Sequence, residues 1–583
     1  MGATSGDVAV GPRYGILSSW INRRLRPYIL FPFLGLMALV LAYPIFMVVY
    51  GSFKGGPPGT DAPFTVDGYV RAWTHWRTYK ALIVTFGLAV PRVLLGATFS
   101  IIVTWVITRT NTPWRGLFER LIWFKLFLPG LPVLVAWLLI AGGKMGLVNV
   151  FLMDVFHLSS PPLDIRSFWG VIFLALMTST ATFFMYLAPG FRNMDASLEE
   201  SSRVSGASSL TTLFRITVPV LMPAITGVTL LIFLFALASY ETELFLLSGR
   251  GVYVFTTLIW WNLAQYPVDY PGAMAVANAF LVFTAIVILL QFRILGGRQY
   301  TTITGRGFTV RPIDLGRWRW VTFGLVMSWV LVGLVLPLVV LIWGTLQRTY
   351  AVADSPLTLM WWRKAFEEDT LPNSFKNTMI LGLLAATGGT VLYTIMSYVG
   401  LRTKLKGREW ITALSWVPRM APGIIAAVGI LWAVLGGIPG IKFLYGTLAL
   451  MAIVIVLERT PQGMRMLEGG MVQLSAELEE AARSSGASWF QTMRRVVLPL
   501  LAPTLLNEWL LCFLGATRAL VILLFIYKPG TKTMSLEIFN MMTASDMQPA
   551  AVLGVVLTAV TMVVATLAAF VAGRQRRMLE GRA

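Results

Sequence analysis

Long apolar stretches alternate with short polar segments along the whole chain of 583 residues. A helix of roughly 20 apolar residues is long enough to cross a hydrocarbon layer of about 30 Å. About twelve such stretches occur, near 29–51, 82–108, 121–141, 168–188, 219–240, 272–294, 321–345, 376–401, 410–435, 444–460, 499–525 and 550–573. The pattern predicts an all-α polytopic membrane protein with about twelve transmembrane helices.

Composition and charge agree with a membrane protein. Hydrophobic residues make up 56% of the chain and charged residues only 13%, which is too apolar for a soluble fold. The net charge of +20 does not indicate nucleic-acid binding, because the basic residues occupy alternate loops between the apolar stretches. The basic loops include Arg23, Arg109, Arg298, Arg402 and Arg574. This alternation predicts that both termini are cytoplasmic, with Lys528 and Lys532 as exceptions.

One polar phrase occurs twice along the chain, at residues 199–208 and 479–488. Matching residues 280 apart are Gly206 with Gly486 and Pro219 with Pro499, and matching residues 293 apart are Arg109 with Arg402 and Pro129 with Pro422. The change of spacing places an insertion in the first half, between 143 and 167. The chain is therefore predicted to consist of two halves of about six helices with the same orientation, a parallel repeat about an axis along the membrane normal.

The repeated phrase resembles the EAA motif of ABC-importer permeases. The motif positions are Glu480, Ala481, Ala482, Gly486 and Pro499 in the second copy, and Glu200, Ser201, Ser202, Gly206 and Pro219 in the first. The two glutamates suit the positive N-terminal end of a short helix, and the two glycines permit a reversal into a second, basic helix. An ordinary amphipathic connector is the alternative, but a connector has no reason to keep its glycine and proline in register.

The resemblance implies a type I ABC importer permease in the bacterial inner membrane, with two cytoplasmic loops that each dock an ATP-binding ABC subunit. No Gly-xxxx-Gly-Lys-Ser/Thr phosphate loop is present, so this chain is not expected to be an enzyme, and ATP and Mg would be bound by the partner subunits. A periplasmic or lipid-anchored solute-binding protein would deliver the solute. We expect no bound cofactor and no metal site, because Cys512 is the single cysteine and the only histidines, His75 and His157, are far apart.

These observations divide the chain into five parts. We expect a cytoplasmic N-terminal segment at 1–28, a first permease domain at 29–295, a cytoplasmic linker at 296–320, a second permease domain at 321–573 and a basic cytoplasmic tail at 574–583.

Interruptions at matching places in the two halves are candidates for the transport path. Pro129-Gly130 and Pro422-Gly423 interrupt the third and ninth stretches, and either a packing kink or a gate would explain them. Lys125 and Arg419 lie just before these interruptions, and we expect both to snorkel to the lipid headgroups.

Charged residues inside the apolar stretches are the other candidates, because a charge in hydrocarbon is costly. Arg92 and Glu508 lie deep in the second and eleventh stretches, and the repeat replaces them by Ala385 and Val228. The path hypothesis and a structural ion pair remain open for both. Three further residues would line a vestibule or lie at the interface: Glu241, Glu243 and Arg518.

The segments 239–243, 253–257 and 265–270, together with 107–113, are similar to fused permeases of the ferric-iron, thiamine and phosphonate branch. Tyrosine and aspartate oxygens suit Fe(III), which makes ferric iron the preferred solute, with thiamine, a polyamine or a phosphonate as alternatives. Aromatic residues in these segments would equally suit the docking of a binding protein. A secondary transporter is a more distant possibility, since it would not need two docking loops.

Overall fold

The computed structural model describes residues 14–295, 312–349, 356–402, 407–421, 423–438 and 440–580. All elements assigned within these ranges are helical, in agreement with the predicted all-α fold. The long helices of the first half are α1 (Tyr14–Ser52), α3 (Trp76–Arg109), α7 (Phe168–Asn193), α10 (Val218–Leu237) and α13 (Tyr270–Leu295). Those of the second half are α14 (Arg319–Val330) joined to α15 (Leu336–Thr345), α17 (Thr370–Arg402), α21 (Leu448–Val472), α24 (Leu498–Thr517) and α26 (Met547–Glu580).

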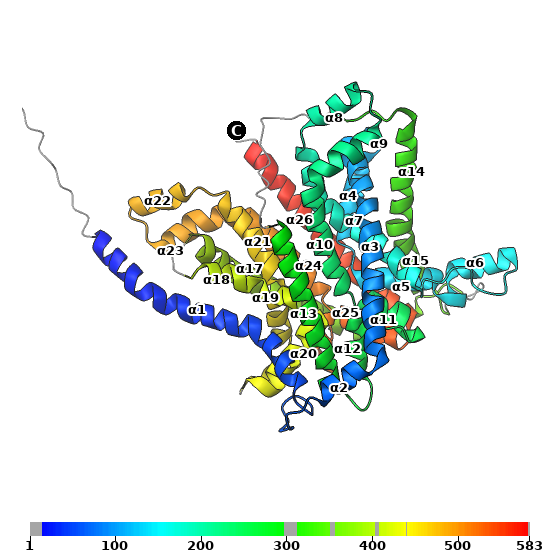
Figure 1. Ribbon diagram of the computed structural model, residues 1–583, viewed down its shortest axis with the longest axis horizontal. Coiled ribbons are helices and arrows are strands. Elements are labelled where there is room, and N and C mark those ends of the chain that lie inside the picture. Colours follow the sequence, from blue (N-terminus) through cyan, green and yellow to red (C-terminus); the bar gives the residue numbers. More distant parts are fainter. Residues whose placement is uncertain are drawn as a thin grey trace, which may run out of the picture.

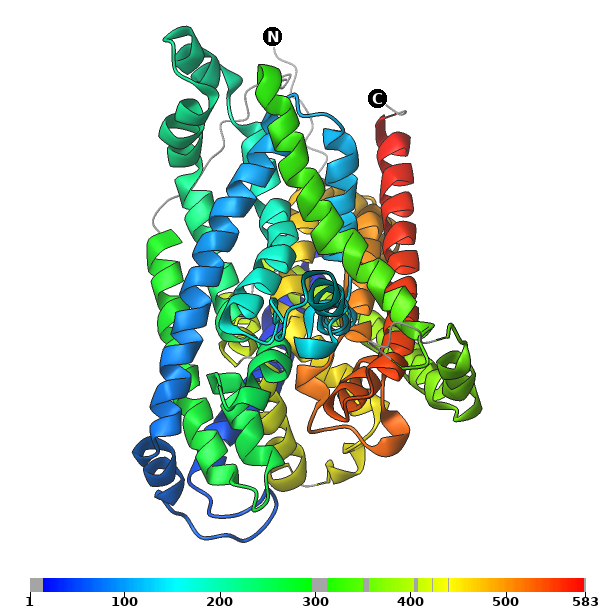
Figure 2. The ribbon, with the colours of Figure 1, turned by 90° about the vertical axis from the view of Figure 1, so that its right-hand side faces the viewer.

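Nine helices in the described residues are long and apolar enough to span a membrane, and three bent helix pairs raise the number to as many as twelve. The bent pairs are α4 (Arg115–Leu126) with α5 (Gly130–Ala141), α11 (Glu241–Leu247) with α12 (Phe255–Ala264), and α18–α19 (Glu409–Ser415, Val417–Met420) with α20 (Gly423–Trp432). Figure 2 shows α3 (blue), the joined α14 and α15 (bright green) and α26 (red) running lengthwise between two ends of the molecule. The predicted number of about twelve spans therefore agrees with the structure.

The spans differ from the prediction at two places. The stretch expected at 444–460 is the longer helix α21, which continues to Val472 and carries enough charge to fail the apolar criterion. The bent pair α11–α12 lies in a segment that was expected to connect two spans. Charged residues in mid-helix explain the first difference, because they resemble the end of a span in a hydropathy pattern.

The break between α4 and α5 follows from local backbone chemistry. Pro129 has an extended conformation, and a residue that precedes a proline is disfavoured in a helix, so α4 ends and α5 restarts at Gly130. The two helices meet at 102°, and the equivalent pair before and after Ala421 meets at 101°. Each half therefore contains one sharply bent pair at the same place in its order of helices.

Three equivalent helices form the centre of each half. In the first half α3 packs against α7 and α10, and in the second half α17 packs against α21 and α24. A short helix repeats at a spacing of 293 residues, as α2 (Asp67–Thr74) and α16 (Met360–Glu367). An isolated β-bridge repeats at the same spacing, as Lys54–Phe64 and Gln347–Leu357. The spacing inferred from sequence is thus also the spacing of the structural elements.

The first helix of each half packs on the other half. Helix α1 lies against α18 and α20 of the second half, while α15 lies against α5 of the first half as well as against α26 of its own half. Close backbone approach makes this exchange possible: a Cβ on Gly51 would lie 2.9 Å from the Trp432 ring, and one on Gly344 would lie 2.7 Å from Leu139. Both pairs are related by the spacing of 293. The exchange joins the halves into one body (Figure 1).

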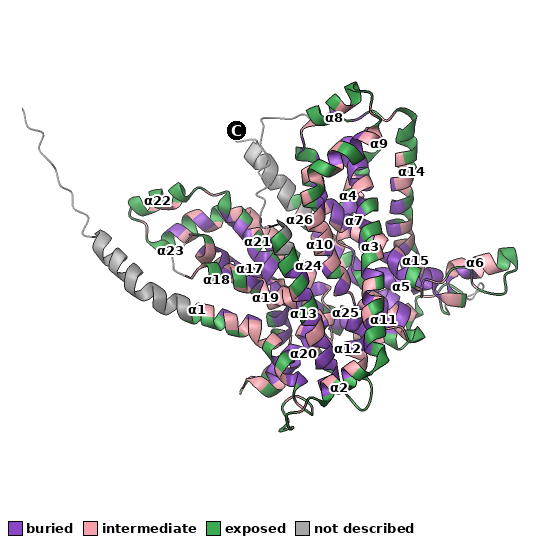
Figure 3. Cartoon of the chain, viewed as in Figure 1, coloured by how far each residue is buried: buried purple, intermediate pink, exposed green. Residues whose placement is uncertain are grey.

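Burial follows from this packing. Nearly all of α5 is buried, and Figure 3 shows buried residues where α5 and α15 meet. Exposed residues lie along the outward sides of α8 (Ala196–Val204), α14 and α22 (Ala476–Ser484) (Figure 3). Two further helices are α6 (Leu147–Phe156) in the predicted insertion and α25 (Met534–Thr543) near the last span.

The contact between α1 and α20 generates a prediction. A Cβ at position 429 would lie 2.2 Å from the carbonyl oxygen of Pro44, so Gly429→Ala forces α1 away from α20. Overpacking of this kind lowers the free energy of unfolding by about 1–3 kcal/mol. The matched control is Gly388→Ala, because nothing lies within 4 Å of a Cβ at that site in α17. Unfolding of both variants in a detergent titration measures the difference, and equal midpoints would contradict the close contact.

Candidate functional site

Two helical loops have identical layouts. The first helical loop, 196–217, contains α8 (Ala196–Val204), α9 (Ser209–Thr212) and the π-helical turn η2 (Leu213–Thr217). The second, 476–497, contains α22 (Ala476–Ser484), α23 (Trp489–Thr492) and the π-helical turn η8 (Met493–Val497). Every boundary in the second loop lies 280 residues after its counterpart in the first. Figure 1 shows α8 and α9 at the end opposite α2 and α12, with α22 and α23 apart from them.

The turn in each loop depends on a glycine. Gly206 and Gly486 have φ values of 85° and 86°, which are unfavourable for residues with a Cβ. Ser208 and Ser488 then cap the helices that follow by accepting hydrogen bonds from the backbone N–H groups of Thr211 and Gln491. The predicted reversal is therefore present in both loops.

The predicted second, basic helix is present in each loop and is continuous with the span that follows it. Arg215 lies in η2, and Arg494 and Arg495 lie in η8, each of which continues without a break into α10 or α24. Because the π-helical turn absorbs one extra residue, the backbone enters the span directly and needs no second turn.

The other motif residues are mostly on the surface of the loops. Those that are exposed are Glu200, Ser201, Pro219, Glu480, Ala481 and Pro499, and those that are half-buried are Ser202 and Ala482. Large apolar side chains are exposed beside them, including Leu210 (59%) in the first loop and Phe490 (65%) in the second. A polar face with exposed apolar anchors is typical of a surface that binds another protein.

A buried ion pair ties the first loop to α3. The Arg109 Nε donates to Glu199 Oε2 at 3.0 Å, and its Nη2 lies 2.5 Å from the same oxygen. The Thr217 hydroxyl donates to the other Glu199 oxygen at 2.8 Å, and both charged side chains are almost completely buried. Motion of this loop is thus linked directly to a core helix.

The second loop has the equivalent pair in a looser form. Arg402 Nε lies 3.5 Å from Glu479, with both side chains partly exposed. Tyr398 donates to Glu479 at 3.2 Å and accepts a hydrogen bond from the Trp489 indole at 3.1 Å. The sequence-based candidates omitted Glu199 and Glu479, although both precede the motif glutamate and both arginines follow the repeat spacing.

A cavity of about 560 Å³ lies between the two halves. It is lined by α3, α7, α10, α21 and α24. Three sequence-based candidates line it together, Arg92, Glu508 and Arg518. Helices of both halves thus bring deep charges from distant parts of the chain to one space, as expected for a path through a transporter.

Arg92 is paired with Glu243 rather than with Glu508. Its Nη1 lies 2.5 Å from Glu243 Oε1, and the Ser239 hydroxyl donates to the other Glu243 oxygen at 2.6 Å. Arg92 is 6% exposed and Glu243 1% exposed. Arg92 thus has the structural ion pair that the sequence left open, but its partner is Glu243 and not Glu508, because the bend into α11 brings Glu243 to α3.

The bent pair α4–α5 faces Glu241. A Cβ on Gly130 would lie 3.6 Å from Glu241 Oε2, and both residues line a smaller cavity of about 230 Å³ that Arg92 also lines. In the second half a Cβ on Gly423 would lie 3.3 Å from Val521, the residue that replaces Glu241 in the repeat. Pro129 forms the N-cap of α5, whereas Pro422 lies outside the described residues.

Lys125 does not snorkel to the headgroups as predicted. Its side chain is 5% exposed, and its ammonium donates to the carbonyl of Gly333 in the π-helical turn η5 (Leu331–Val335) and lies 5.7 Å from the centre of the Trp329 ring. The residue four positions after Gly333 is Pro337, which has no N–H to bond this carbonyl, so the carbonyl is available to Lys125. Arg419 instead lies over the Phe235 ring, 4.4 Å from its centre, beside the 560 Å³ cavity.

Arg459 also lines the 560 Å³ cavity and was missed from the sequence. The predicted span ended at 460, which placed Arg459 at an interface, but α21 extends from Leu448 to Val472 and places it in mid-helix. A charge near the centre of a long helix with apolar flanks was the signal available.

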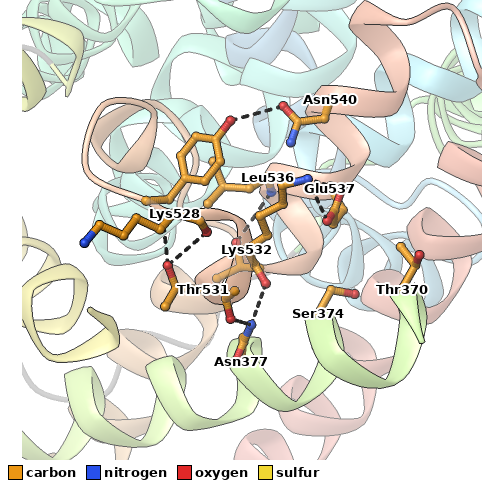
Figure 4. A network of polar contacts seen from close by, with 12 residues as sticks. Thr370, Ser374, Asn377, Lys528, Thr531, Lys532, Leu536, Glu537 and Asn540 are labelled. Atoms are coloured by element: carbon orange, nitrogen blue, oxygen red, sulfur yellow. Dashed lines mark hydrogen bonds and ion pairs between the residues drawn. The ribbon is translucent and has the colours of Figure 1, made fainter. Parts of the chain in front are cut away.

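A cavity of about 640 Å³ lies at the end of the molecule opposite the helical loops. It lies beside Lys528 and Lys532, the exceptions to the alternation of charge between loops. Figure 4 shows Asn377 of α17 donating to the carbonyls of Gly530 and Lys532, and Lys532 pairing with Glu537 at 3.2 Å. Lys528 lies 5.3 Å from the centre of the Tyr445 ring, which lines the cavity. This network holds the segment after α24 against α17.

Comparisons with known proteins agree with a transport component. Residues 380–577 match the family described as the binding-protein-dependent transport system inner membrane component. A putative ferric transport system permease protein of Haemophilus influenzae is 27% identical over 67% of this chain and 61% of its own length. A ferric transport system permease protein of Actinobacillus pleuropneumoniae is 26% identical over 72% of this chain and 61% of its own length. The chain therefore spans 61% of the length of each of these relatives.

A third relative covers a smaller part of the chain. The spermidine/putrescine transport system permease protein PotC of Escherichia coli K12 is 24% identical over 36% of this chain and 77% of its own length. The relatives thus include proteins named for chemically different solutes.

The pair of Arg92 and Glu243 generates a prediction about folding. Arg92→Gln or Glu243→Gln alone leaves one buried charge without its partner, which costs about 3–5 kcal/mol. The double variant removes both charges and should recover much of the lost stability. Yield and unfolding midpoint in detergent measure both effects. A double variant as unstable as the sum of the single variants would show that the two charges act independently.

Proposed function

We propose that this chain, whose residues 380–577 match the family of binding-protein-dependent transport system inner membrane components, is the membrane-spanning subunit of an ATP-driven importer. The observation that carries the proposal is the pair of matched helical loops, each with a glycine turn, exposed apolar side chains and an arginine–glutamate anchor. One chain would then offer two docking sites to two ATP-binding subunits. A solute-binding protein would dock at the opposite end.

The ion pairs supply a physical route from the docking loops to the cavity. Glu199 is anchored to Arg109 at one end of α3, and Arg92 on the same helix lines the 560 Å³ cavity. A rigid helix transmits displacement along its length, so closure of the partner subunits would reposition the cavity wall. Alternating access would follow from movement of the two halves against each other.

Ferric iron is the solute that we propose for this importer, on the strength of the two relatives named for ferric transport. A small organic solute such as thiamine, a polyamine or a phosphonate is the alternative, and the relative named for spermidine and putrescine supports a polyamine. The ligand of the binding protein that pairs with this chain would decide between them. A secondary transporter would require no ATP-binding partner, so purification of the chain without such a subunit would favour that class.

The matched loops predict an assembly of one chain with two ATP-binding subunits. Each loop presents the same backbone and the same turn, so each should hold one subunit. Native mass spectrometry of the complex purified in mild detergent measures the ratio. A complex with a single ATP-binding subunit would refute the equivalence of the two loops.

Changes in the second loop should uncouple ATP hydrolysis from uptake. Gly486→Asp introduces a side chain at a φ of 86°, at a cost of about 1–2 kcal/mol, and Glu480→Lys reverses an exposed charge. Neither position lies in a span, so the protein should still insert into the membrane. Matched controls outside both loops are Gly116→Asp and Glu409→Lys, since both sites are exposed. Solute uptake per ATP hydrolysed should fall only in the two loop variants, and normal coupling in them would refute the docking role.

A further inference from the structure

The two sides of the 560 Å³ cavity occupy equivalent positions but differ in chemistry. Helices α7 and α21 begin 280 residues apart, and the positions that line the cavity correspond pairwise. The pairs are Ser179 with Arg459, Thr182 with Gln462, and Tyr186 with Met466. The first half therefore contributes mostly hydroxyl groups where the second half contributes a guanidinium and an amide. A shared scaffold does not require this difference, which indicates recognition of a solute.

The charges on the second half of the cavity wall form no direct ion pair in the described part of the chain, although Arg459 lies close enough to Glu508 for the two charges to attract each other. Arg518 donates only to the carbonyls of Leu514 and Leu126, and Arg459 donates to the carbonyl of Leu511, so neither forms an ion pair with a carboxylate in the described part of the chain. Glu508 is 3% exposed and likewise has no ion pair there. By contrast, Glu243 neutralises Arg92 at the edge of the cavity.

Unpartnered hydrogen-bonding atoms face the same region. The Arg459 Nε and the Ser179 hydroxyl are both buried without a hydrogen-bond partner in the described structure. A charge or a polar atom inside a membrane domain needs water, a partner or a ligand to offset its desolvation. The cavity volume is within the range of 300–1,000 Å³ typical of small-molecule sites.

We infer that this cavity is a binding site for an anionic, oxygen-rich solute, held by Arg459 and Arg518 and by the hydroxyl groups of the opposite wall. This inference rests on the proposed function, because it names the solute class of that transporter. Guanidinium groups bind carboxylate and phosphate oxygens with two parallel hydrogen bonds, whereas they repel a bare cation. Glu508 would accept a hydrogen bond from a donor on the solute and would limit how much negative charge the site accepts.

The inference restricts how ferric iron would cross. The described residues contain no group of three or more histidine, cysteine, aspartate or glutamate side chains that could hold a metal ion. A hard Fe(III) ion needs several oxygen ligands. Iron would therefore cross with its ligands supplied by an oxyanion. The same wall chemistry also suits a free organic carboxylate or phosphonate, and it disfavours a polyamine.

Binding to the full-length chain in lipid nanodiscs tests the inference. The probes are ferric citrate, citrate, inorganic phosphate and spermidine, with dissociation constants measured by titration calorimetry. Arg459→Gln and Arg518→Gln should each weaken binding of the anionic probes about tenfold or more, as expected for the loss of a charged hydrogen-bond donor. Glu508→Gln should leave anion binding unchanged or tighten it, and Arg459→Lys should recover part of the loss. Lys144→Gln, far from the cavity wall, is the matched control for loss of a positive charge.

The sign of the effects decides the outcome. Tighter binding of ferric citrate than of citrate would assign the site to an iron complex, and the reverse would assign it to a free anion. Tighter binding of spermidine, weakened by Glu508→Gln and unaffected by the arginine variants, would overturn the inference, as would binding of none of the probes. ATP-dependent uptake and co-purification of ATP-binding subunits are measured separately. Their absence would refute the proposed importer whatever the calorimetry gives.

Discussion

A polar or charged group inside a membrane domain must find a partner, a water-filled cavity or a ligand, and most features of this protein follow from that requirement. Arg92 is satisfied by Glu243, and Lys125 is satisfied by the carbonyl of Gly333. Arg459 and Arg518 reach backbone carbonyls but no carboxylate at ion-pair distance in the described residues, Glu508 has no ion pair there, and all three line one cavity. The groups that the protein does not satisfy internally therefore mark the place where a solute would be held.

The two halves of the chain share their backbone arrangement but differ in the side chains that line the cavities. The helical loops, the bent helix pairs and the exchanged first helices recur at spacings of 280 or 293 residues. Packing requires this repetition, because each half covers the other in the same way. The cavity wall departs from it: Glu508 replaces Val228, Arg459 replaces Ser179, and Glu241 is replaced by Val521. A pathway on the axis between two similar halves can in this way become selective without any change of fold.

The two helical loops likewise share a backbone but differ in their side-chain contacts. The first is fixed to α3 by a fully buried pair, and the second is held to α17 by a longer, partly exposed contact that also involves Tyr398 and Trp489. A buried pair with short contacts constrains its partners more than an exposed one does. In the proposed importer, the two halves would thus respond unequally to ATP-binding subunits, even though the loops have the same backbone.

The sequence by itself determined the features that depend on local pattern: the apolar stretches, the repeat, the glycine turns at Gly206 and Gly486, and the break at Pro129-Gly130. Hydropathy and backbone preference act over a few residues, so they can be recognised without a fold. Only the tertiary structure decided that Arg92 pairs with Glu243, that Lys125 is buried against Gly333, and that Arg459 faces the central cavity. These outcomes depend on how distant helices cross and on which face each helix turns toward its neighbours. A rotation of a helix by the angle between two successive residues changes which neighbour a side chain meets.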